Sequence, residues 1–147
     1  MHATRLFLGA LFSVVLAAGA VAATAPTPTI VTPDATKWVA GTGDAKGTWS
    51  AVLMGNPNGT GPYIMRLKLP ANYTFPPHTH TNTENVTIIS GSVWFGLGKT
   101  MDKSKMKEFP AGTFASIPAK LPHYAMTKVE TVIQLSGDAP YTVTMLK

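Results

Sequence analysis

The sequence contains no cysteine and has little charge, since only 13% of its 147 residues are Asp, Glu, Lys or Arg. Without cysteine no disulfide can stabilise the fold, which suits a chain that is exported and must avoid mispairing. Only Arg5 and Arg66 are arginines, and the formal net charge of +5 is spread along the chain. No cluster of guanidinium groups is therefore present to read phosphates or bases, and we expect no nucleic-acid partner.

The sequence also lacks long helical periodicity and internal repeats. Instead, 13 glycines and 12 prolines separate short runs in which apolar and polar residues alternate. In the clearest run, Tyr63–Leu69, the odd-numbered residues form an apolar face and leave Arg66 and Lys68 in solvent. Short strands at regular spacing, with turn residues between them, predict a single all-β domain built as a sandwich or barrel.

The strands that we expect lie at 48–54, 63–69, 84–89, 92–97, 114–117, 121–126, 129–135 and 141–146. An extended segment also carries the first histidines, after the Pro76-Pro77 pair. Between the strands we expect one long charged loop, from Gly98 to Pro110.

The first 23 residues have the pattern of a secretory signal peptide. Arg5 precedes an apolar run from Leu6 to Ala18, and Ala20-Val21-Ala22 offers a cleavage site of small residues. The alternative is an uncleaved membrane anchor, but no basic residues stop the run. We therefore expect a periplasmic or secreted protein with no membrane segment after cleavage. Residues 24–36 then form a proline-rich linker or arm, and 37–147 form the β domain.

Every histidine after the signal region belongs to one small set of polar residues. His78 and His80 are two residues apart, so in an extended strand they point to the same side. Glu84 follows closely, and His123 can reach them from a later strand. Three imidazoles and one carboxylate suit one divalent transition-metal ion (Mn, Fe, Ni, Cu or Zn) better than calcium or magnesium. The alternative is an accidental cluster of structural or surface histidines.

These residues resemble the two sequence motifs of the cupins. His78-x-His80-x3-Glu84-x6-Gly91 is similar to the first motif, and Gly112-x5-Pro118-x4-His123 is similar to the second. The resemblance covers the chain from about Trp49 to Leu146. It implies a jelly-roll barrel, a metal held by His78, His80, Glu84 and His123, and a homodimer.

Three positions depart from the cupin pattern. Asn72 stands where the family has a glycine, and asparagine tolerates a left-handed backbone well. Lys120 also replaces a glycine, and lysine there costs on the order of 1 kcal/mol if the position needs positive φ. Thr127 replaces an asparagine that is not a ligand.

Four protein ligands leave one or two positions on a metal open for water, oxygen or a chelating molecule. The first hypothesis is a non-haem metalloenzyme, an oxygen-using oxidoreductase acting on a small oxygen-chelating molecule. The alternatives are a metal-dependent lyase or isomerase without redox chemistry, and a metal- or ligand-binding protein without turnover. Tyr63 and Tyr73 are the candidate acid or base groups, whereas Tyr124 should point away from the metal. The expected pocket walls are Met65, Leu67, Val86, Ile88, Phe95 and Ala125.

Overall fold

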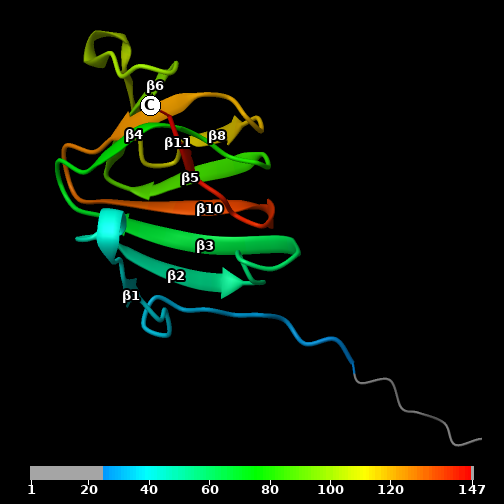
Figure 1. The fold of residues 1–147 in the computed structure, drawn as a ribbon. Coiled ribbons are helices and arrows are strands. Elements are labelled where there is room, and N and C mark those ends of the chain that lie inside the picture. Colours follow the sequence, from blue (N-terminus) through cyan, green and yellow to red (C-terminus); the bar gives the residue numbers. More distant parts are fainter. Residues whose placement is uncertain (1–24, 147) are drawn as a thin grey trace, which may run out of the picture.

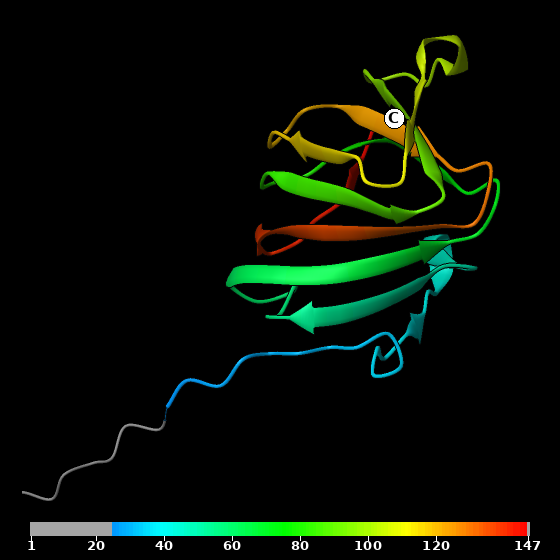
Figure 2. The same cartoon turned by 180° about the vertical axis from the view of Figure 1, so that it is seen from behind.

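Two antiparallel β-sheets face each other and make up most of the structure, a computed structural model that describes residues 25–146 (Figures 1 and 2). The first sheet has six strands, in the order β1 (Val39–Ala40), β2 (Trp49–Met54), β3 (Gly61–Leu69), β10 (Thr131–Ala139), β5 (Glu84–Ser90) and β8 (Phe114–Ile117). The second has five, in the order β11 (Thr144–Met145), β4 (Thr74–Thr79), β9 (His123–Met126), β6 (Ser92–Leu97) and β7 (Lys107–Pro110). This all-β jelly roll is the predicted fold class.

Helical structure within residues 25–146 is limited to two short 3-10 turns, η1 (Gly43–Ala45) and η2 (Lys103–Lys105). No helix in this range is long and apolar enough to cross a membrane. The predicted signal peptide, residues 1–23, lies outside the described residues. Residues 25–36 contain no strand and include a turn closed by a hydrogen bond from the Ala35 amide to the Thr32 carbonyl at 3.1 Å.

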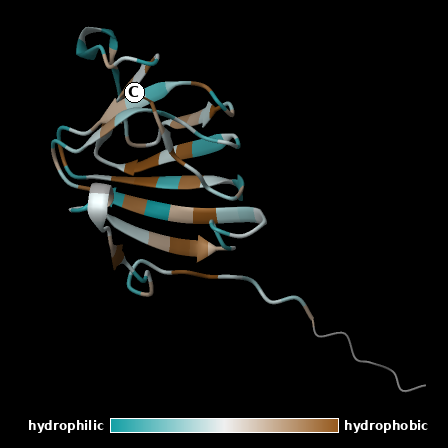
Figure 3. Cartoon of the chain, in the orientation of Figure 1, coloured by the Kyte–Doolittle hydropathy of each residue, from teal (hydrophilic) through white to brown (hydrophobic). Residues whose placement is uncertain are grey.

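The core forms where the alternating strands pair in register. Apolar and polar residues alternate along β3 and β10, as Figure 3 shows. Pairing places Met65 opposite Leu135, and Ile133 opposite Ile88. These residues join Tyr63 and Leu69 in one buried cluster. On the other face of β3, Arg66 donates a hydrogen bond to Gln134 at 3.2 Å, so it points away from the space between the sheets, as predicted.

The structure corrects several predicted boundaries. The expected loop from Gly98 to Pro110 contains η2 and the strand β7, because Phe109 and its neighbours pair with β6, where Phe109 lies opposite Val93. The short strand β1 was not predicted. The last expected strand, 141–146, is reduced to Thr144–Met145, and the strand expected at 121–126 begins only at His123.

The topology brings the predicted metal ligands to the space between the sheets. His78 in β4 and His123 in β9 are paired neighbours in the second sheet. His80 follows the last residue of β4, and Glu84 is the first residue of β5 in the first sheet. The short connection between β4 and β5 therefore crosses from one sheet to the other and carries a ligand at each end.

Candidate metal centre

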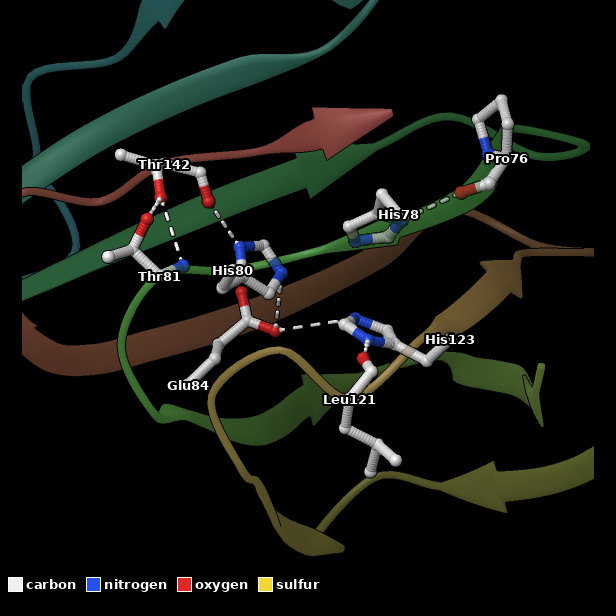
Figure 4. A network of polar contacts seen from close by, with 8 residues as sticks. All are labelled: Pro76, His78, His80, Thr81, Glu84, Leu121, His123 and Thr142. Carbon is white, nitrogen blue, oxygen red and sulfur yellow. Dashed lines mark hydrogen bonds and ion pairs between the residues drawn. The ribbon is translucent and has the colours of Figure 1, made fainter. Parts of the chain in front are cut away.

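Four side chains from distant parts of the chain meet between the sheets (Figure 4). One ligand nitrogen from each of His78, His80 and His123 lies within 4.8 Å of the other two. The three histidines and Glu84 are all buried, with exposed fractions between 2% and 6%. The structure thus brings together all four residues that the sequence singled out, and the three histidines form a group able to hold a metal ion.

Each imidazole is held by a backbone carbonyl. Nδ1 of His78 contacts the Pro76 carbonyl at 2.7 Å, Nδ1 of His80 the Thr142 carbonyl at 2.5 Å, and Nδ1 of His123 the Leu121 carbonyl at 2.9 Å (Figure 4). A carbonyl only accepts, so each Nδ1 carries the proton and each Nε2 presents a lone pair. Such contacts orient histidines that bind metals.

Glu84 completes the site from the other sheet. Its Oε2 lies 3.4 Å from Nε2 of His80 and 3.9 Å from Nε2 of His123. Two ligand atoms bound at about 2.1 Å to one ion lie about 3.0 Å apart when adjacent and about 4.2 Å apart when opposite. Both observed separations fall inside this range. Nε2 of His80 is buried and makes no hydrogen bond of good geometry, so a metal ion fits the donor set.

Residues 26–141 match the model of the ChrR cupin-like domain family. The chain belongs to this family. No curated protein sequence matches it.

Solved structures share the fold of this cupin-like chain. The polyketide cyclase RemF from Streptomyces resistomycificus has a TM-score of 0.64 and 19% identity, over 82% of this chain and 87% of that chain. An RmlC-like cupin from Shewanella frigidimarina has a TM-score of 0.59 and 12% identity, over 76% and 91%. A chain in the complex of Rhodobacter sphaeroides SigE with the anti-sigma ChrR has a TM-score of 0.54 and 18% identity, over 73% and 51%. At these identities the likeness concerns the fold alone.

The electrostatics of the cupin-like centre separate one histidine from the other two. Burial lowers the pKa of His78 and of His123 below the ordinary value of 6.5. Burial acts on His80 in the same direction, but the nearby Glu84 carboxylate and the Thr142 carbonyl outweigh it, so the pKa of His80 is raised. At neutral pH His78 and His123 therefore keep free lone pairs, and a proton competes with a metal mainly at His80.

Tyr141 is a residue of the centre that the sequence analysis missed. Its ring stacks on His80 with centroids 5.3 Å apart, and it lies 5.9 Å from the ring of Tyr63. Burial raises its pKa well above 10, and the charge of Glu84 adds to this effect. In the sequence Tyr141 stands only as an aromatic residue after a proline in an expected strand, so nothing marked it.

Of the two candidate tyrosines, Tyr63 lies beside the candidate metal centre and Tyr73 does not line its cavity. Tyr63 is buried beside His80, Glu84 and Tyr141, and burial followed by the Glu84 charge raises its pKa to about 12. Tyr73 packs edge-on against Phe75, with centroids 4.9 Å apart, and is not among the residues that line the cavity at the histidines. Tyr63 and Tyr141 therefore stay protonated near neutral pH and can donate a hydrogen bond but not act as bases.

Tyr124 lies on the opposite side of β9 from His123, as alternation requires. It is fully buried, and its hydroxyl donates to the Asp102 carbonyl at 3.2 Å. Its ring packs directly over Gly96, where any Cβ would collide with it. Tyr124 therefore anchors the loop that contains η2 and takes no part in the centre.

A cavity of about 60 Å³, the metal cavity, adjoins His78, Glu84 and His123. Four of the six predicted wall residues line it: Leu67, Val86, Phe95 and Ala125. The prediction is wrong for Met65, which packs in the core, and for Ile88, which lines a second cavity. No lysine, arginine or aspartate lines the metal cavity. A molecule bound there meets apolar walls and, apart from the ligand residues, only neutral side chains.

The turns before His78 and His123 keep a left-handed backbone at the two substituted glycine positions. Asn72 has φ 61° and Lys120 has φ 63°, both in the left-handed region. The Lys120 amide donates to the His80 carbonyl at 2.8 Å, which connects the second motif to the first. Thr127 is buried, donates to the Pro70 carbonyl at 2.7 Å and accepts from the Tyr73 amide at 3.1 Å. It therefore holds the turn that contains Asn72.

Proposed function

We propose that this cupin-like protein binds one divalent transition-metal ion through His78, His80, Glu84 and His123. We also propose that the metal-loaded protein is a non-haem oxidoreductase that uses dioxygen to oxidise a small molecule chelating through oxygen. The observation that carries the metal site is the set of three buried imidazoles whose Nδ1 protons are tied to carbonyls. One ligand nitrogen from each imidazole lies within 4.8 Å of the other two, and the Glu84 carboxylate lies beside two of them, which supports binding of one ion by all four side chains.

The chemistry of the donor set limits the metal and the reaction. Three nitrogens and one oxygen suit Mn, Fe, Ni, Cu or Zn. When bound, such an ion polarises an oxygen ligand and, if it is redox-active, activates dioxygen. The chain itself supplies apolar walls that exclude water, and Tyr141 supplies a neutral hydroxyl next to the site.

Two alternatives differ in what they require of the chain. A redox-neutral lyase or isomerase needs a group that removes a proton, and Tyr63, with a pKa of about 12, is a poor base. Among the described residues that line the metal cavity, the only ionisable side chain besides His78, Glu84 and His123 is Tyr141, and burial raises its pKa well above the ordinary value. Because the metal cavity has few groups that could act as a base, the second candidate is a protein that binds a metal and a small ligand without turnover.

Metal analysis combined with oxygen uptake separates the two candidates. Natively loaded protein is analysed for its elements and by electron paramagnetic resonance, and oxygen uptake is then measured with diketones, phenolics and thiols. The oxidoreductase proposal expects a redox-active metal near one ion per chain and oxygen uptake that disappears in His123→Ala. A zinc-filled protein that binds ligands but takes up no oxygen supports the binding protein. A protein that takes up no transition metal overturns both.

The cellular location of the protein is predicted by its first 23 residues. We propose that residues 1–23 direct export and are removed, so that the mature protein acts in the periplasm or outside the cell. The support is the apolar run and the small-residue cleavage site. Intact mass of the protein from cell fractions tests this, and a chain that begins at Met1 in the membrane fraction overturns it.

We also propose a homodimer formed at the β1–β2 side of the first sheet. Val39, Val52 and Met54 are 65%, 51% and 39% exposed there, and β1 is an edge strand. Exposed apolar residues beside an edge are typical of pairing surfaces. Analytical ultracentrifugation should show a dimer that dissociates in Val52→Lys, and a monomeric wild type overturns the proposal.

A further inference from the structure

A second cavity, of about 170 Å³, shares part of its wall with the metal cavity. Four residues line both cavities: Val86, Val93, Phe95 and Ile117. Ile88 and Phe109 line the second cavity but not the metal cavity. We call it the distal cavity. No residue of the predicted metal centre lines it, so its chemistry differs from that of the metal cavity.

The direction from one cavity to the other follows β5. Glu84, Val86 and Ile88 alternate along this strand and so face the same side. A strand rises about 3.3 Å per residue, which places Ile88 roughly 13 Å from Glu84. The metal centre, the shared walls and the distal cavity therefore follow one another along the space between the sheets.

The walls of the distal cavity are almost entirely apolar. Thr113 is the single polar side chain that lines it, and no ionisable residue does. Ala115 of the edge strand β8 pairs with Val86, so it faces inward, yet it is exposed. The cavity thus opens to solvent beside β8, and its interior suits an alkyl or aromatic group but no charged one.

We propose that the distal cavity is a binding subsite for the apolar tail of a ligand whose oxygen-bearing head is held at the metal centre. The shared walls carry the proposal, because four apolar residues that line the metal cavity also line the cavity that contains Ile88 and Phe109. The substrate class is then an amphiphile with a chelating head and an uncharged alkyl or aromatic body. This inference rests on the proposed metal site for the position of the head.

A series of chelators that differ only in tail length tests the subsite. Acetohydroxamate, butanohydroxamate, hexanohydroxamate and octanohydroxamate are titrated into metal-loaded protein by calorimetry. We expect the affinity to rise roughly fourfold for each methylene that becomes buried. Methyl NMR shifts of Ile88 give a second readout, since Ile88 lines the distal cavity and not the metal cavity. They should move with octanohydroxamate and not with acetohydroxamate.

Two neighbouring substitutions on β8 provide a matched pair. Ala115→Trp fills the distal cavity from its exposed edge, whereas Ser116→Trp places the same side chain on the opposite face of the strand. In Ala115→Trp acetohydroxamate should bind as in the wild type, and the gain from longer tails should be lost. Ser116→Trp should retain the whole dependence on tail length.

The outcomes distinguish failure of the subsite from failure of the metal site. If acetohydroxamate binds but tail length has no effect, or has the same effect in Ala115→Trp, the subsite is overturned and the metal site stands. If no hydroxamate binds the metal-loaded protein, the subsite is overturned and the metal site stands. If the protein takes up no transition metal at all, both are overturned. A change of oligomeric state in Ala115→Trp, seen by ultracentrifugation, overturns the subsite in favour of a second copy covering the cavity.

Discussion

The turn before His78 and the turn before His123, the first and last of the proposed ligands, share one backbone conformation. The residues that adopt it, asparagine and lysine, are not equally suited to it. Asn72 precedes β4 with φ 61°, and Lys120 precedes β9 with φ 63°. Asparagine adopts this region readily, because its short polar side chain can bond locally. Lysine does not, and the conformation costs about 1 kcal/mol there. The strain lies at the second turn.

The contacts of the two turns explain why both persist. The Asn72 turn is held by Thr127, a buried side chain from the end of the other motif. The Lys120 turn is held by its own amide, which donates to the carbonyl of the ligand His80. Each motif is therefore fixed by an atom of the other, and the unfavourable residue occurs where its backbone contact positions a ligand directly.

The largest expected effect is on metal binding, when the proposed ligand that follows either turn is removed. His78→Ala and His123→Ala should each weaken metal binding by at least about tenfold to a hundredfold, since even substitutions behind a ligand have effects of this size. Calorimetric titration with a divalent metal measures this, and circular dichroism should show that the β fold remains. Unchanged metal stoichiometry in either variant would remove that histidine from the site.

The next effect tests the contact that holds the first turn. Thr127→Val keeps the volume but leaves the Pro70 carbonyl and the Tyr73 amide without these partners in a buried place. The free energy of unfolding should fall by about 1–3 kcal/mol in urea denaturation. Thr74→Val, at an exposed position of β4, should change it by less than about 0.5 kcal/mol. Equal losses in the two variants would contradict the role of Thr127.

Much of this site was predictable because its signals are local. The spacing of His78 and His80 and the alternation in Tyr63–Leu69 each specify which side of a strand a residue occupies, and the structure agrees with both. A pattern of this kind is decided within a few residues and needs no knowledge of distant contacts. The left-handed turns at Asn72 and Lys120 were suggested only by the resemblance to the cupin motifs, and for Lys120 a differently built turn was left open.

The missed features depend on contacts between distant residues. Tyr141 reaches His80 only because the chain after β10 returns to the edge of β4, where β11 pairs with it, and the carbonyl of Thr142 holds that histidine for the same reason. β7 is a strand because β6 pairs with it, although two of its four residues are charged and three are exposed. Ile88 was assigned to the metal cavity because alternation gives the face of a residue but not its height along the barrel.

A smaller effect follows from exchanging the two turn residues for glycine. Lys120→Gly should raise the free energy of unfolding by about 1 kcal/mol, because glycine adopts positive φ without steric cost. Asn72→Gly should raise it by no more than a few tenths, since asparagine already tolerates the conformation. Urea denaturation of the metal-free proteins gives both values. Equal changes, or a loss in Lys120→Gly, would show that strain does not distinguish the turns.

The smallest expected effect is on the pKa of His80, which should differ in direction from the pKa values of His78 and His123. In metal-free protein, NMR titration should find His80 with a pKa above 6.5 and His78 and His123 with values below it. Glu84→Gln removes the carboxylate that raises the pKa of His80, so burial should then bring that pKa below 6.5.

A histidine with a raised pKa stabilises the fold below pH 6.5, and this contribution is lost as the pH rises through its folded pKa. Glu84→Gln should therefore lose stability at mildly acidic pH relative to neutral pH, whereas Glu130→Gln, at an exposed position, should not. If His80 keeps its raised pKa in Glu84→Gln, the carboxylate is not its cause, and the pairing of the two ligands across the sheets is wrong.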